Sequence, residues 1–167
     1  MTAGATYTPI ATTTLGSTVG SYTFTSIPST YTDLIIVGNV LGNGSVSINF
    51  SFNGDTGTNY SYTVLDGNGS AVQVSRQTNT TNIQFAGWSY NLNSTTNPST
   101  MIANIMNYSN ATTYKTALVR SMALGTPGNC VDAFVGTWRN TAPITSITIT
   151  GSVVSGTTFT LFGISAA

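Results

Sequence analysis

Hydrophobic and polar residues alternate with a period of two along almost the whole 167-residue chain, and a helical period is almost absent. The clearest stretch lies between Gly44 and Gly54, where Ser and Asn separate the apolar residues Val46, Ile48, Phe50 and Phe52. This alternation predicts a strand with one buried face. Asn53 and Gly54 accept positive φ at low cost, so they predict a hairpin turn directly after it.

Further strands are predicted by the same pattern, separated by turn residues every 8–12 positions. They include residues 6–15, 21–27, 60–64, 131–139, 144–151 and 157–164. The unbroken apolar run 34–37 predicts a strand covered on both faces. Residues 101–108 and 113–124 also predict paired strands, with helical turns as the alternative over 101–106 and 117–124. The expected fold is an all-β, antiparallel, jelly-roll-like β-sandwich of about ten strands, with residues 1–167 in a single domain.

Charged residues make up only 5% of the chain: four Asp, three Arg, one Lys, and neither His nor Glu. Thr, Ser and Asn together fill about 40% of the positions. The formal net charge is zero, whereas nucleic acids and anionic membranes are bound by cationic surfaces, so neither is an expected partner. Because repulsion between neutral molecules is weak, self-association is expected instead.

The four carboxyl groups predict structural roles rather than catalysis. Without His, the chain lacks the usual base of a catalytic triad. Asp55 and Asp66 lie in Gly-rich turns, where Asp normally caps its own backbone, and Asp33 and Asp132 lie at the starts of predicted strands. A pairing of Asp33 or Asp132 with an arginine is open. We therefore expect no enzyme, no catalytic residue and no cofactor.

Metal binding has little support in the sequence. Residues 53–59 place oxygen side chains at alternate positions, faintly like a calcium loop, but lack the further acidic ligands and the closing Glu. Cys130 stands alone in a chain without His, which leaves no zinc ligand set and no internal disulfide. We expect Cys130 to be a small buried hydrophobe.

Aromatic residues set among Asn, Ser and Thr leave carbohydrate binding open, because flat rings beside short polar groups suit a sugar. The set is Tyr60, Tyr62, Trp88, Tyr90, Tyr108, Tyr114 and Trp138. Strands and sandwich cores use the same residues, so packing is the favoured interpretation for most of them. The start of the chain shows no secretory signal pattern, and no apolar run reaches the 18 residues of a membrane helix.

Several segments together resemble a known group of proteins. They are YTPIATTTL at 7–15, YTFTSIPSTYTDL at 22–34, INFSFNGDTGTNYSY at 48–62, ITSITI at 144–149 and FTLFGI at 159–164. They are similar to virion structural proteins, often described as tail-fibre or minor structural proteins, of tailed phages of aquatic bacteria, including cyanobacteria. The resemblance spans nearly the whole chain and is weakest over 88–138. It implies a β-sandwich virion component and transfers no functional residue.

A charge-poor domain of this size fits an oligomeric capsid decoration (cement) protein on the virion surface, because burying neutral side chains avoids the cost of desolvating charges. Its expected partners are copies of itself and other virion proteins, either the major capsid protein or tail and fibre components. The alternative is a tail-fibre or receptor-binding adhesin that contacts host-surface glycans. The sequence does not identify the interface residues.

Overall fold

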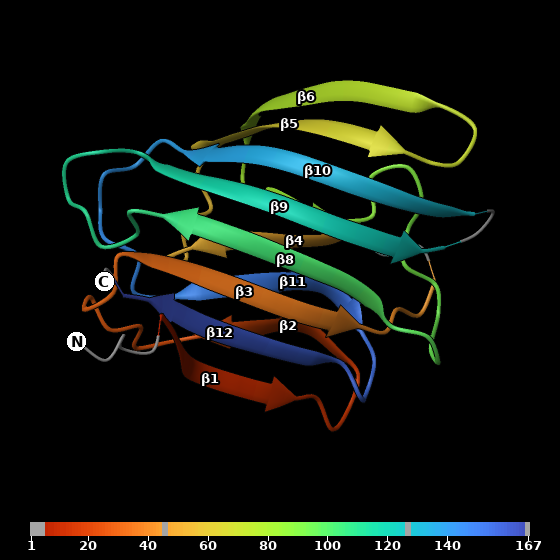
Figure 1. The fold of residues 1–167 in the computed structure, drawn as a ribbon, viewed down its shortest axis with the longest axis horizontal. Coiled ribbons are helices and arrows are strands. Elements are labelled where there is room, and N and C mark those ends of the chain that lie inside the picture. Colours follow the sequence, from red (N-terminus) through yellow and green to blue (C-terminus); the bar gives the residue numbers. More distant parts are fainter. Residues whose placement is uncertain (1–5, 45–46, 126–127, 166–167) are drawn as a thin grey trace.

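A computed structural model describes residues 6–44, 47–125 and 128–165, and in these ranges the chain forms twelve antiparallel strands and no helix (Figure 1). None of the described elements is therefore a helix long and apolar enough to cross a bilayer. The strands are β1 Tyr7–Thr14, β2 Val19–Phe24, β3 Asp33–Val40, β4 Ile48–Phe52, β5 Tyr60–Gly67, β6 Val72–Thr80, β7 Ile83–Ala86, β8 Ser99–Met106, β9 Lys115–Leu124, β10 Asn129–Trp138, β11 Ile147–Val153 and β12 Thr158–Ile164.

The strands form two sheets packed as a sandwich. The larger sheet has eight strands in the order β1-β12-β3-β8-β9-β10-β5-β6, and the smaller has four in the order β2-β11-β4-β7. In Figure 1 the larger sheet lies in front, and β2, β11 and β4 lie behind its β12–β9 half. The four-stranded sheet is too narrow to cover the larger one completely: β5 still contacts β7, whereas the exposed strand β6 extends beyond it.

The alternating pattern forms the core as expected. Ile48, Phe50 and Phe52 of β4 are fully buried, while Asn49 and Ser51 between them stay partly exposed. Val46, which belonged to the same predicted strand, lies outside the described residues. A single cluster of buried side chains runs between the sheets, with Trp138, Tyr60 and Phe134 from the larger sheet packing toward β4 and β7. Burial of such large side chains is the main stabilising contribution to the sandwich.

The fold prediction is confirmed in class, with corrections in detail. The protein is an antiparallel β-sandwich, but it has twelve strands rather than about ten, and the unequal division into eight and four strands does not confirm a jelly-roll topology. Residues 101–106 and 117–124 lie in β8 and β9, so the strand interpretation was right. The run 34–37 lies in β3, inside the larger sheet between β12 and β8.

Turn chemistry fixes the hairpins. Asn53 and Gly54 adopt φ of 53° and 66°, as predicted for the turn after β4. The second turn is shifted from its predicted place, because Asp66 and Gly67 belong to β5 and the cap is Asn68. The Asn68 side chain accepts hydrogen bonds from the backbone N–H of Ser70 and Ala71. The sequence Thr126-Pro127-Gly128-Asn129 also predicts a turn, and the first two of these residues lie outside the described ranges.

Candidate functional site

The outward face of the eight-stranded sheet carries large hydrophobic side chains that contact solvent. We call the following six residues of β5, β6, β9 and β10 the apolar face: Leu65, Val72, Val74, Leu118, Val131 and Val135. Their exposed fractions run from 39% at Leu118 to 75% at Val72. Single exposed hydrophobic residues are ordinary on protein surfaces, whereas a contiguous group indicates an interaction site.

Strand register shows that the apolar face is contiguous. Leu118 of β9 lies directly opposite Val135 of β10, and Leu65 of β5 lies opposite Val74 of β6. Ala133, also exposed, bridges them, because it sits between Val131 and Val135 along β10 and opposite Leu65 on β5. Directly opposed residues have Cβ atoms about 5 Å apart, so these side chains form one connected surface across four strands.

The outward face of the four-stranded sheet is different. Its outward positions are hydroxyl and amide residues: Ser21, Thr23, Asn49, Ser51, Thr148 and Thr150. Thr23 and Thr148 even form a cross-strand hydrogen bond of 3.1 Å between their hydroxyl groups. The same chain therefore builds one polar and one apolar outward face, and a general tolerance of exposed hydrophobic residues does not explain that difference.

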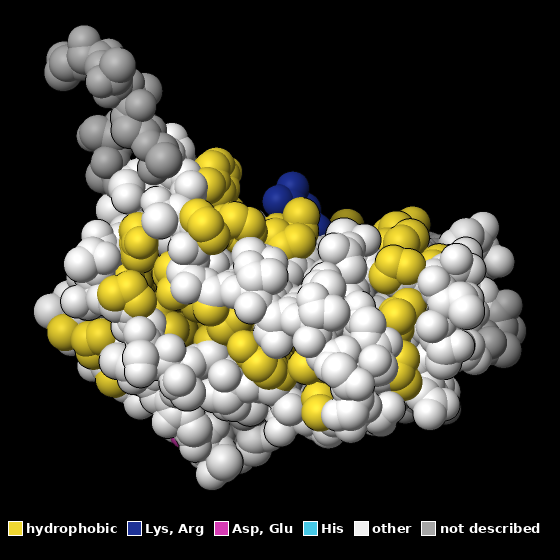
Figure 2. Space-filling model, turned by 90° about the horizontal axis from the view of Figure 1, so that it is seen from below, with side chains coloured by type: hydrophobic (Ala, Val, Ile, Leu, Met, Phe, Trp, Pro, Cys, Tyr) yellow, Lys and Arg dark blue, Asp and Glu magenta, His cyan; other side chains and the backbone are white. Residues whose placement is uncertain are grey.

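Charged residues are sparse on the outward face of the eight-stranded sheet. Arg76 of β6 and Arg120 of β9 are exposed and project from the same outward face as the apolar residues. Lys115 is fully buried, and Arg139 is held by Ser61, Asn79 and the carbonyl oxygen of Thr58. A view from the β1 side shows hydrophobic groups among uncharged polar ones and very few charged atoms (Figure 2).

Two shallow hollows lie on the apolar face. One, of about 270 Å³, is formed by Leu65, Val72, Val131 and neighbouring residues of β5 and β10. The other, of about 420 Å³, is formed by Leu118, Val135 and adjoining residues of β8, β9 and β10. Both are open depressions in a sheet surface, which suits the side chains of another protein better than it suits enclosure of a small substrate.

The aromatic set does not form a sugar-binding platform. Tyr60, Tyr62, Tyr108 and Trp138 are buried, and Trp88 and Tyr90 are partly buried against the core. Only Tyr114 in this set is well exposed, at 57%. The packing interpretation is confirmed for most of these residues, and the structure brings no cluster of exposed rings together from them.

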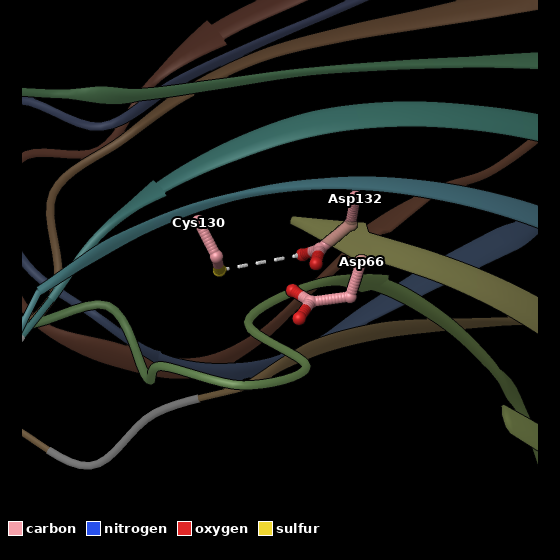
Figure 3. A group of neighbouring side chains, drawn as sticks. All are labelled: Asp66, Cys130 and Asp132. Carbon is pink, nitrogen blue, oxygen red and sulfur yellow. Dashed lines mark hydrogen bonds between the residues drawn. The ribbon is translucent and has the colours of Figure 1, made fainter. Parts of the chain in front are cut away.

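A pair of buried carboxyl groups is the most unusual feature of the interior (Figure 3). Asp66 of β5 and Asp132 of β10 are directly opposed in the register, and both point into the sandwich beside Cys130. They are 0% and 4% exposed. Oδ2 of Asp132 accepts hydrogen bonds from Gly87 N–H (3.2 Å), Trp88 N–H (3.4 Å) and the Ser121 hydroxyl (3.3 Å).

The remaining oxygens of this pair have no hydrogen-bond donor. Ser89 donates to Oδ2 of Asp66, which leaves Oδ1 of Asp66 and Oδ1 of Asp132 buried and unsatisfied. Burial, and then the hydrogen bond and charge of Asp66, raise the pKa of Asp132 to about 6. One proton held between the two carboxyl groups gives the pair an O–H donor and removes the repulsion between two charges.

This pair corrects the prediction that Asp66 caps a turn. A glycosidase also needs two facing carboxyl groups, one of them with a raised pKa. Those groups must reach a substrate, whereas Asp66 and Asp132 are buried away from solvent. The arrangement can hold a proton in the interior, and it offers no surface on which a sugar could bind.

Asp66, Cys130 and Asp132 are also the one group among the described residues whose ligand atoms lie close enough for a metal ion, within 4.8 Å of one another. Burial raises the pKa of the Cys130 thiol to about 11, helped by the nearby Asp132 and Asp66 charges, so the sulfur stays protonated at neutral pH. Its thiol points to Oδ2 of Asp132 at 3.8 Å. The expected burial of Cys130 is confirmed, at 2% exposure.

The other two Asp residues have structural partners. Asp55 accepts hydrogen bonds from Gly57 N–H, the Asn59 amide and the Trp138 indole. Partial burial works against its ionisation, but these hydrogen bonds prevail and lower the pKa of Asp55. The carboxylate oxygens of Asp55, the one acidic residue of the faint calcium-like loop, thus accept hydrogen bonds from protein donors. Asp33 accepts from Asn107 N–H at 2.7 Å, and the hydrogen-bond partners of Asp33 and Asp132 include no arginine.

Sequence reasoning did not identify the apolar face or the carboxyl pair. The outward Val and Leu residues of β9 and β10 alternate with buried ones, and the alternation alone does not say which of the two sets the second sheet covers. The pairing of Asp66 with Asp132 joins positions 66 residues apart. A scan against protein-family models found no matching family, and a search of curated proteins found no similar protein.

Proposed function

We propose that this chain is a non-enzymatic structural protein on the surface of a phage virion, acting as an oligomeric capsid decoration protein. The observation that carries the proposal is the apolar face, whose six hydrophobic residues lie uncovered on four adjacent strands. A surface of this kind is stabilised when another protein covers it. The virion setting is supported by the sequence resemblance described above.

Charge depletion supports the same role. Interfaces bury their central residues away from water, and a charge placed there costs several kcal/mol unless it is well paired. On the apolar face the charged residues are Arg76 and Arg120, whose long aliphatic stems can lie along hydrophobic neighbours. Most of the face can therefore be covered without the desolvation of a charge.

A tail-fibre or receptor-binding role is the competing proposal, and the geometry favours it less. It would use exposed aromatic rings to bind host glycans, and Tyr114 is the exposed member of the predicted set. Copy number separates the two roles. Quantitative mass spectrometry of purified particles is expected to find hundreds of copies per virion, and a count of a few copies would favour the fibre.

The apolar face itself can be tested with matched variants. Val131→Asp places a charge within the apolar face on a residue of β10 that is 60% exposed, so the fold should be retained. Ser21→Asp places the same charge on the polar outward face of β2. Added to particles that lack the protein, Val131→Asp is expected to lose at least tenfold in binding, and Ser21→Asp to bind like the wild type. Equal binding by both variants would refute the assignment of the interface.

A further inference from the structure

Strand β6 ends the eight-stranded sheet with a free edge. It pairs only with β5, and each of its nine residues is at least partly exposed. Figure 1 shows it at the outermost position of the larger sheet, beyond the strands of the smaller one. Such an edge presents a row of backbone N–H and C=O groups to which another strand can be added.

The other sheet edges formed by described strands are protected. At the opposite end of the large sheet, β1 carries Pro9 and a register shift between Pro9 and Ala11, both of which interrupt regular pairing. In the smaller sheet, β7 has only four residues, all buried. Its other edge, β2, contains Gly20, and the pairing of β2 with β11 is irregular near its start. β6 has none of these devices over Val72–Thr78.

The hairpin turn between β5 and β6 shows which backbone N–H and C=O groups of β6 have no partner in β5. Asn68 N–H donates to Ala71 C=O at 3.2 Å, which makes these two residues a hydrogen-bonded pair. Because such pairs alternate in an antiparallel ladder, Gln73 and Ser75 bond to β5, while the N–H and C=O of Val72, Val74 and Arg76 point away from it. The outward groups thus belong to residues whose side chains lie on the apolar face.

We infer that β6 pairs antiparallel with β6 of a second copy of this chain, joining two large sheets into one continuous sheet. This deepens the proposed function by naming one of its partners. The strand is self-complementary, because its single charged residue is Arg76, and pairing centred on Val74 places the two guanidinium groups apart while Val74 meets its own copy. A chain of zero net charge adds no long-range repulsion.

Two-fold pairing at this edge also extends the apolar face. Val72 and Val74, exposed by 75% and 71%, are the residues of the face that lie nearest the edge. In the dimer Val74 packs against Val74 of the second copy and Val72 lies opposite Arg76 of that copy, while Leu65, Val131 and Val135 of both copies stay available on one side of the joined sheet. The dimer therefore presents a doubled surface to a third protein, which matches an oligomeric decoration protein.

The test exploits the direction of the Val74 N–H. Val74→Pro removes a donor that points away from β5, so the β5–β6 ladder is kept and the added strand loses a central bond. Val74→Thr keeps the N–H and the β-branched shape as the matched control. Sedimentation from about 1 µM to about 200 µM is expected to show a wild-type monomer–dimer equilibrium, because one strand pair is a small interface. We expect Val74→Pro to be monomeric throughout and Val74→Thr to dimerise within about threefold of the wild type.

Crosslinking gives a second readout that does not depend on tolerance of proline. Under mild oxidation Val74→Cys is expected to form a disulfide-linked dimer, since directly opposed strand residues have Cα atoms about 5 Å apart. Leu118→Cys, on the same face but three strands away, should stay monomeric, and the native Cys130 is buried.

A wild-type monomer at every concentration with no crosslink would overturn the inference, and so would a dimer that persists in a folded Val74→Pro variant. The inference would also be overturned if the cysteine of Val74→Cys formed a crosslink only in assembled particles, and only to a different virion protein. That result would exclude a second copy as the partner of β6. These results are distinct from failure of the proposed function, which would appear as unaltered particle binding by Val131→Asp.

Discussion

Replacement of Asp132 by Asn should make the protein more stable at pH 8. Asn has nearly the shape of Asp: its oxygen can accept the hydrogen bonds of Gly87, Trp88 and Ser121, and its amide can donate to the free oxygen of Asp66. The amide N–H group of the new side chain thus provides at every pH the hydrogen bond to Asp66 that a shared proton provides only at low pH. It also satisfies both orphan oxygens without placing a second charge in the interior.

The magnitude follows from the raised pKa. The pKa of Asp132 lies near 6 in the folded protein, against an ordinary value of 3.8, because of burial and of its neighbour Asp66. One pKa unit corresponds to about 1.4 kcal/mol, so the shift represents roughly 3 kcal/mol at most. The folded state binds more protons than the unfolded state between these values. The contribution of the pair is therefore complete below about pH 4, falls as pH rises through 6, and is lost above it.

Urea unfolding followed by tryptophan fluorescence at pH 4, 5, 6, 7 and 8, at one protein concentration, measures this directly. Subtracting the free energy of unfolding of the wild type from that of the variant at each pH removes the contribution of the other titrating groups. Asp66→Asn is the matched control, because it neutralises the opposite member of the pair. We expect Asp132→Asn to gain about 2–3 kcal/mol over the wild type at pH 8 relative to pH 4, and Asp66→Asn to gain less, because burial of Asp132, the larger cause of its raised pKa, remains. A difference that does not change with pH would refute proton sharing.

Three further outcomes follow from buried groups. Lys115→Met should destabilise the protein by about 3 kcal/mol in urea, because the buried ammonium donates to the carbonyl oxygens of Asn110, Thr113 and Thr141, which would lose their donor; a loss below about 1 kcal/mol would contradict this. The Cys130 thiol should not react with Ellman's reagent in the folded protein and should react fully in urea, since it is buried and its pKa is near 11; prompt labelling of the native state would show that the interior opens. Asp55→Asn should lower the free energy of unfolding by about 1–2 kcal/mol at pH 7, measured by thermal or urea unfolding, because the ionised carboxylate accepts a hydrogen bond from the Trp138 indole N–H at 2.7 Å. This difference from the wild type should shrink at pH 3, where the wild-type carboxylate becomes protonated.

The sequence by itself determined the fold class and most strand positions. Period-two alternation is a local property, so the spacing of Ile48, Phe50 and Phe52 predicts a buried strand face without information from the rest of the chain. Turn residues act equally locally, which is why Asn53 and Gly54 were placed correctly. Charge depletion and the solitary cysteine also follow from composition alone, as does the expectation that most of the aromatic residues pack in the core.

Only the tertiary structure decided which faces stay uncovered and which distant residues meet. The alternation in β10 predicts that Val131 and Val135 share a face, but their exposure depends on which face of the eight-stranded sheet the four-stranded sheet covers. Asp66 looked like a turn residue because Gly67 and Gly69 follow it, yet β5 continues through it and the register sets it against Asp132. Strand register and sheet width arise from long-range pairing, and no local pattern encodes them.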